Sequence, residues 1–147
     1  MKLKSYLFIL ISCCLETAYS STIDQTIYIN RGVLTTFDNV TLPYLSFNAS
    51  STFQTQSERI LLDMGDSLNL LIKNTDTGSH LISFLGLDKS STRIQAGDSA
   101  YIRYTFSTSG LYIYTDSTVD GSNTYLGLAG MIYVRKSIEK KVFFWNI

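Results

Sequence analysis

Cysteine is scarce in this chain of 147 residues: its two cysteines, Cys13 and Cys14, are neighbours near the amino terminus. Residues 1–20 have the pattern of an export signal, with lysines before an apolar run and small residues before the expected cleavage after Ser20. Cleavage there would leave the mature chain without a thiol. In that form, disulfides and thiolate-ligated metal sites are excluded.

Cys13 leaves a second processing route open. The sequence Leu10–Cys13 resembles the processing box of bacterial lipoproteins, in which Cys13 would become the lipidated amino terminus. The export-signal pattern favours the soluble form, and the apolar run is too short to span a bilayer. The expected location is therefore secreted, periplasmic or the cell envelope, with membrane attachment only if Cys13 is lipidated. The mass of the mature protein distinguishes these products.

Histidine is also scarce, because His80 is the only one in the sequence, and the formal net charge of the chain is zero. A balanced charge argues against a nucleic-acid-binding surface. A single imidazole cannot complete a catalytic dyad or triad that uses two histidines. The chain has no Gly-x-Ser-x-Gly element and no supported pair of catalytic carboxylates. The isolated chain is therefore not expected to be an enzyme.

Alternating apolar and polar residues dominate positions 21–135, with turn residues about every ten positions. This pattern predicts an all-β fold, an antiparallel sandwich or barrel in one domain, and no helix. Two Gly-Asp-Ser sequences, at 65–67 and 97–99, predict tight turns. The polar stretch 48–57 predicts an exposed loop, or alternatively a lip over a binding surface. Strands are expected at 26–34, 44–47, 59–64, 67–73, 80–85, 92–95, 100–106, 111–115 and 129–135.

Residues 136–147 form a basic and aromatic carboxy-terminal tail beyond the predicted domain. Its lysines are expected to be solvated. The final segment, Val142–Ile147 (VFFWNI), has two open interpretations. It could be a last strand or clasp that packs on this domain, or it could dock onto a following domain of a longer protein.

Six segments in a fixed order carry a family resemblance. They are residues 29–32, 60–68, 71–76, 80–86, 110–114 and 127–134. These segments resemble the N-terminal, plastocyanin-like cupredoxin domain of multicopper oxidases and copper nitrite reductases. The resemblance implies a Greek-key β-sandwich from a family of copper-dependent oxidoreductases.

The resemblance allows the trinuclear copper ligands to be checked. It implies two His-x-His pairs, and Ser83 and Leu85 stand at the first pair. Thr115 and Ser117 stand at the second. Because none of these side chains is an imidazole, the resemblance implies that the domain contributes no ligand to a trinuclear centre.

The nitrite reductase form of the domain implies a blue-copper site of two histidines, one cysteine and one methionine. His80 falls at the first histidine and Asp116 at the cysteine, while Asn123 approximates the second histidine and Leu128 the methionine. A blue-copper centre depends on its thiolate. We therefore expect a degenerate copper site, no cofactor, and no catalytic, cofactor-binding or metal residue. A hydrogen-bonded structural role for His80 is favoured over a surface copper site shared with Asp116.

The loop after position 115 has one other possible role. Asp116, Thr118 and Asp120 with Gly121 resemble the beginning of a calcium-binding loop. The twelfth position is Gly127 instead of glutamate. A plain turn is therefore favoured.

The sequence predicts a secreted, copper-free cupredoxin-like domain that serves binding or assembly. Its partner would be another protein or a second cupredoxin domain, of unknown identity. The alternative is the N-terminal domain or a fragment of a multicopper oxidase or copper nitrite reductase-type oxidoreductase whose copper sites lie in other domains. A third and weaker possibility is a noncanonical copper carrier centred on His80.

Overall fold

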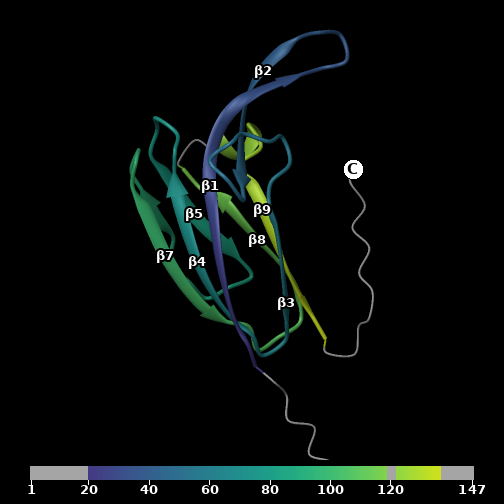
Figure 1. Ribbon diagram of the computed structural model, residues 1–147, viewed down its shortest axis with the longest axis vertical. Coiled ribbons are helices and arrows are strands. Elements are labelled where there is room, and N and C mark those ends of the chain that lie inside the picture. Colours follow the sequence, from purple (N-terminus) through teal and green to yellow (C-terminus); the bar gives the residue numbers. More distant parts are fainter. Residues whose placement is uncertain (1–19, 119–121, 137–147) are drawn as a thin grey trace, which may run out of the picture.

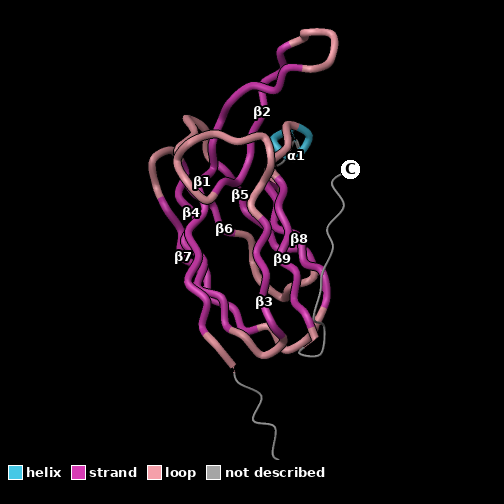
Figure 2. The backbone as a smooth tube through the Cα atoms, turned by 45° about the vertical axis from the view of Figure 1, so that its right-hand side comes forward, coloured by secondary structure: helices cyan, strands magenta, loops and turns pink. Residues whose placement is uncertain are grey.

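The chain forms two β-sheets that pack face to face, as seen in the computed structural model (Figures 1 and 2). The structure describes residues 20–118 and 122–136. The strands are β1 (Thr22–Thr35), β2 (Thr41–Asn48), β3 (Arg59–Asp63), β4 (Ser67–Asn74), β5 (His80–Leu85), β6 (Thr92–Ile94), β7 (Ser99–Thr105), β8 (Gly110–Asp116) and β9 (Ala129–Arg135), with a short helix α1 (Ser122–Tyr125) before β9.

The first sheet has the order β2-β1-β4-β7 and the second has the order β3-β9-β8-β5-β6. Alternation of side chains along each strand builds the core between them. In β7, for example, Ile102 is buried while Tyr101 and Arg103 are exposed. The all-β sandwich predicted from the alternation is confirmed.

Two details of the prediction are wrong. The sheets are mixed and not antiparallel throughout, because β1 runs parallel to β4 and β3 runs parallel to β9. Alternation fixes which residues face the core, but it does not fix which strands become neighbours. No helix was expected, yet α1 makes one helical turn. Four residues are too few to show a helical period in the sequence.

The two Gly-Asp-Ser sequences form turns, as predicted. Gly65 and Gly97 have φ angles of 100° and 78°, a region that favours glycine. Asp66 also ties its turn together, since its carboxylate accepts hydrogen bonds from the backbone nitrogens of Asp63 and Ser21, both at 2.9 Å.

The polar loop at 48–57 is held by the buried side chain of Asn48. Its Nδ2 donates to the carbonyl oxygens of Gln54 and Gln56, and its Oδ1 accepts from Asn30 Nδ2 at 2.9 Å. The surface position of the loop agrees with the prediction, but its backbone is anchored in the core.

Several predicted features lie outside the described residues: the export signal up to residue 19, with Cys13, and the tail from residue 137. Across the described part of the chain, none of the helical structure is long and apolar enough to cross a bilayer.

Tyr114 of β8 fills the centre of the core. It is fully buried, its ring lies 4.8 Å from that of Phe47 between centroids, and its hydroxyl donates to the carbonyl oxygen of Glu58 at 2.5 Å. Burial raises the pKa of Tyr114, so the hydroxyl remains a neutral donor. The ring lies against the backbone of Gly130 on the neighbouring strand β9, at a place where a side chain has no room.

We expect Gly130→Ala to reduce the free energy of unfolding by roughly 1–3 kcal/mol, the usual cost of overpacking. The new Cβ would lie 2.2 Å from Cζ of Tyr114, so the ring would have to move. Urea denaturation measures the change. Gly78→Ala is the control, because its Cβ would meet its nearest neighbour, Asp76 Oδ2, at 3.4 Å. Equal stability of the two variants would contradict the steric account.

Candidate functional site

The four positions that the resemblance assigns to blue-copper ligands lie together at one end of the sandwich. His80 begins β5 and Asp116 ends the adjacent strand β8. Asn123 lies in α1, and Leu128 precedes β9. The backbone nitrogen of Asp116 donates to the carbonyl oxygen of Leu128 at 3.2 Å, which brings the fourth position to the others.

Asp116 occupies the centre of this group. Its Oδ2 atom lies 2.7 Å from His80 Nδ1 and accepts a hydrogen bond from Asn123 Nδ2, also at 2.7 Å. Its Oδ1 atom accepts hydrogen bonds from the backbone nitrogens of Leu81 and Thr118. Burial would raise the pKa of this carboxyl group, but the hydrogen bonds hold the pKa at about 2. The hydrogen bond with His80 lowers the pKa most.

A second carboxylate lies on the other side of the histidine. Asp76 Oδ2 is 3.1 Å from His80 Nε2, and both Asp76 oxygens accept from the Arg31 guanidinium at 2.6 and 2.8 Å. Burial of Asp76 opposes its ionisation, but the hydrogen bond and charge of Arg31 lower its pKa to about 2. The hydrogen bond with Asp76 in turn raises the pKa of Arg31.

These contacts enclose the histidine. Each ring nitrogen of His80 faces a carboxylate oxygen, which accepts hydrogen bonds when it is ionised. The group, here named the His80 network, consists of Arg31, Asp76, His80, Asp116 and Asn123. Each of its two buried carboxylates therefore has hydrogen-bond partners, and Asp76 is also paired with the charged guanidinium of Arg31.

The sequence did not identify the whole network. Asp76 lies four residues before His80, which is a weak signal. Arg31 comes from β1, and nothing in its spacing relates it to His80. The parallel pairing of β1 with β4 brings Arg31 to this place, and the loop between β4 and β5 supplies Asp76.

The residues of the network do not fit a copper ion. Each ring nitrogen of His80 already faces a carboxylate oxygen, so a metal at either position would displace a hydrogen-bond partner. All buried side-chain nitrogen and oxygen atoms of the described residues have hydrogen-bond partners. Within residues 20–118 and 122–136, no group of three or more His, Cys, Asp or Glu side chains is arranged to hold a metal.

The alternative of a surface copper site shared by His80 and Asp116 is contradicted, because this pair does not lie on the surface. The two side chains do meet, but they are only 1% and 0% exposed. The His80 side chain is buried and hydrogen-bonded, an environment that agrees with the structural role favoured from the sequence.

The positions assigned to trinuclear copper ligands lie on the outer side of the second sheet. Ser83 and Thr115 are paired across β5 and β8. The hydroxyl of Ser83 contacts that of Ser117, and the Thr115 hydroxyl lies 3.1 Å from that of Thr124. Leu85 is 55% exposed. The arrangement brings hydroxyl groups together, and neutral hydroxyls do not replace imidazoles as copper ligands.

The possible calcium loop is only partly described, because Asp120 and Gly121 lie outside the described residues. Thr118 belongs to the turn after β8, and its backbone nitrogen donates to Asp116 Oδ1 at 2.9 Å. Both carboxylate oxygens of Asp116 are engaged within the His80 network and its neighbouring backbone. This arrangement favours the plain turn.

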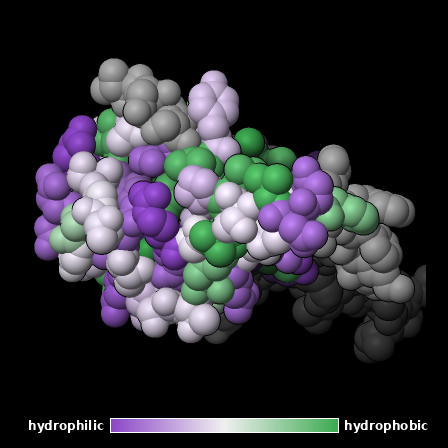
Figure 3. All heavy atoms as spheres, turned by 90° about the horizontal axis from the view of Figure 1, so that it is seen from above, coloured by the Kyte–Doolittle hydropathy of each residue, from purple (hydrophilic) through white to green (hydrophobic). Residues whose placement is uncertain are grey.

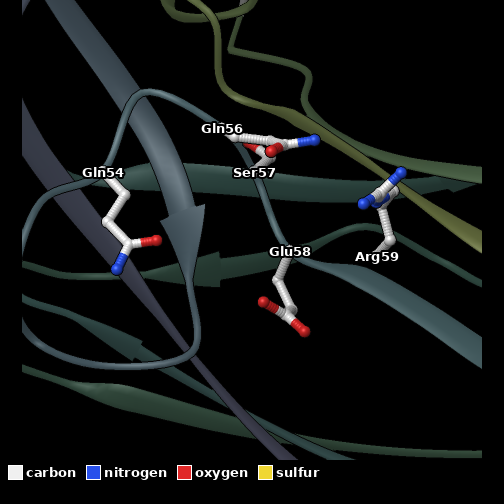
Figure 4. A pocket seen from close by; sticks show the side chains of 5 residues that line it. All are labelled: Gln54, Gln56, Ser57, Glu58 and Arg59. Carbon is white, nitrogen blue, oxygen red and sulfur yellow. The ribbon is translucent and has the colours of Figure 1, made fainter. Parts of the chain in front are cut away.

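A separate pocket of about 200 Å³ lies where the polar loop enters β3 (Figure 4). Its lining includes none of the assigned ligand positions, and its volume is below that typical of a small-molecule site. Figure 4 shows Glu58 and Arg59 directed to opposite sides of the chain. The lining residues are Gln54, Gln56, Ser57, Glu58 and Arg59.

Solved structures of copper proteins share this fold. A multi-copper oxidase from Pseudomonas thermotolerans has a TM-score of 0.70 at 15% identity, over 82% of this chain and 31% of that one. A multicopper oxidase from Campylobacter jejuni, a metallo-oxidase, has a TM-score of 0.68 at 19% identity, over 83% and 27%. Copper nitrite reductase from Nitrosomonas europaea has a TM-score of 0.68 at 17% identity, over 80% and 42%.

These likenesses establish a cupredoxin-like fold and confirm the family resemblance at the level of structure. The chain spans less than half the length of each of the three proteins. No family model matches the chain, and no curated protein matches it in sequence.

We expect the free energy of unfolding to decrease as the pH falls from about 4 to about 2. Asp76 and Asp116 have pKa values lowered from 3.8 to about 2, so their stabilisation is complete above pH 4 and is lost on protonation. Each shift corresponds to roughly 2 kcal/mol. Urea denaturation across this pH range measures the slope.

The conservative variant Asp116→Asn serves as the comparison, because it removes one of the two titrating groups. Its unfolding free energy should be lower at neutral pH and should depend less steeply on pH below 4. A slope equal to that of the unmodified protein would contradict the assignment.

Proposed function

We propose that this protein is an exported, copper-free cupredoxin-fold domain that binds or assembles with another protein of the cell envelope. The observation that carries the proposal is the position of Asp116 Oδ2. It occupies the point on which His80 Nδ1 and Asn123 Nδ2 converge, each at 2.7 Å. An internal, hydrogen-bonded network therefore stands where the resemblance implies a redox metal.

The burial of His80 supports a non-catalytic role. Its side chain is 1% exposed and both of its ring nitrogens face carboxylates, so neither nitrogen is accessible to a bound substrate. The Ser83 and Ser117 hydroxyls contact each other on the surface, away from this imidazole. A serine without a positioned base is a poor nucleophile.

The hairpin formed by β1 and β2 supplies a surface for binding. It projects beyond the rest of the sandwich (Figures 1 and 2), and Phe37 at its tip is fully exposed. Val33, Val40 and Leu42 on the same hairpin are also about half exposed. Seen from above, hydrophobic and hydrophilic side chains lie next to each other on the molecule (Figure 3). Exposed apolar side chains on a projecting element favour a protein contact.

Export is supported by the surroundings of Ser21. Its backbone nitrogen lies 2.9 Å from Asp66 Oδ1. Cleavage after Ser20 would turn this nitrogen into an α-ammonium group and the hydrogen bond into an ion pair. The folded domain would then hold the new amino terminus that the export-signal pattern implies. Lipidation at Cys13 would leave a longer mature chain of different mass.

A second candidate function is that of a scaffold domain in a larger copper oxidoreductase. It is favoured by the structural neighbours, of which this chain spans 27% to 42% in the three examples above. Copper would then be held by other domains. A coding sequence that continues beyond Ile147 into another cupredoxin domain with His-x-His and Cys-His motifs would favour this candidate.

We expect the purified protein to retain much less than one copper ion per chain after loading with Cu(II) and removal of excess metal. The reason is that His80 has no free nitrogen and the remaining assigned positions provide no thiolate. Metal analysis with an absorption scan measures both features. Stoichiometric copper that is lost in His80→Ala would overturn the copper-free proposal.

We expect an envelope protein captured by this domain to be lost in Phe37→Ser, because that substitution removes the exposed ring at the hairpin tip. Tyr101→Ser is the control, since Tyr101 is a 56% exposed aromatic residue on β7. Quantitative comparison of crosslinked envelope fractions measures the difference. A monomer that captures no protein, or equal capture by all three forms, would count against the hairpin as the contact surface.

A further inference from the structure

The outer side of the second sheet carries a continuous apolar surface. Outward-facing residues of adjacent strands are aligned by their pairing: Tyr133 of β9 lies between Leu61 and Leu111. Ile113 of β8 lies in the same way between Met131 and Leu85. We name this surface the apolar face; its members are Leu61, Leu85, Leu111, Ile113, Met131 and Tyr133.

Much of the apolar face is open to solvent. The exposed fractions are 57% for Leu111, 55% for Leu85, 45% for Leu61 and 39% for Ile113. An antiparallel or mixed sheet in a sandwich normally presents polar residues on its outer side. A patch of this kind, on the order of several hundred Å², marks a contact site in a folded monomer.

The other sheet shows what a solvated outer side looks like in the same molecule. Asn69 of β4 donates to Asp24 of β1 at 2.7 Å and accepts from Arg103 of β7 at 2.9 Å. The ammonium group of Lys73 lies 5.5 Å from the ring centroid of Tyr28. Polar and charged groups thus cover this sheet, so the apolar face is a local property of the second sheet.

We propose that the carboxy-terminal segment Val142–Ile147 of the same chain packs on the apolar face. The chain leaves the described structure immediately after β9, which is itself one of the strands of the face. The segment beyond contains five apolar residues: Val142, Phe143, Phe144, Trp145 and Ile147. A short connection, residues 136–141, therefore joins the apolar face to an apolar segment of the same chain.

The connection is long enough to return over the face. Trp145 lies nine positions after Lys136, and an extended chain spans up to about 30 Å over nine positions. The face is three strand spacings wide between β3 and β5, or about 14 Å. Its length along β9 from Arg135 back to Met131 is about 13 Å. The aromatic side chains can therefore reach every member of the face.

Covalent connection favours this segment over a second copy of the chain. A short linker gives its two ends an effective concentration on the order of millimolar, well above that of a separate molecule in dilute solution. The hairpin is a less accessible target, because it projects at the opposite end of the sandwich from the end of β9 (Figure 1). Packing of the segment would also remove its aromatic rings from water.

Trp145 tests the proposal directly, because it is the only tryptophan in the chain. In the full chain we expect blue-shifted emission and low sensitivity to acrylamide quenching. Leu111→Asp should shift the emission to that of solvated tryptophan and raise the quenching constant several-fold. Val33→Asp is the matched control, because Val33 is 58% exposed on the hairpin, and its emission should remain unchanged.

Leu85→Asp provides a second substitution on the face, and circular dichroism establishes that each variant is folded. Solvated Trp145 in the unmodified protein, or emission unchanged in both folded face variants, would overturn the proposal. A blue shift that disappears on dilution together with a dimer in sedimentation would assign the face to a second copy instead. A blue shift seen only with anionic lipid vesicles would assign the segment to a membrane. The fluorescence of Trp145 reports on the position of the tail alone, so its result is independent of whether the domain binds copper.

Discussion

The contact of the buried His80 ring with two carboxylates is the interaction on which one end of the molecule depends. Through Asp116 it joins the beginning of β5 to the end of β8, and through Asp76 it reaches Arg31 on β1. Asn123 connects the same carboxylate to α1. Removing one partner from such a group would leave a buried charge uncompensated, which typically costs about 3–5 kcal/mol. The network is therefore a structural centre of the domain.

The same network bears on function because it uses the atoms that a metal would need. Asp116 Oδ2 is the common acceptor for His80 and Asn123, and Asp76 engages the second nitrogen of the imidazole. A cupredoxin-like fold can thus hold these loops together by hydrogen bonds and ion pairs. Fold and chemistry are separable here, as is common among widely used folds.

The two sheets differ in the surfaces that they present. One has a polar outer side crossed by the Asp24, Asn69 and Arg103 hydrogen bonds, and the other carries the apolar face. The β1–β2 hairpin adds exposed apolar residues at a separate place. Exposed apolar groups thus lie at two separate places on the surface, whereas the polar groups of the His80 network are gathered in the interior.

The all-β class, the approximate strands, the turns at Gly65 and Gly97, and the residue types at the assigned ligand positions could all be predicted from the amino-acid sequence. These properties depend on local alternation, on glycine and on residue type, which can be read without knowing the neighbours. The parallel pairings, the approach of Arg31 to Asp76 and His80, and the alignment of the apolar face became visible only in the folded chain. Each depends on which distant strands lie side by side, because the charge state of a buried group and the extent of a surface are properties of neighbours in space.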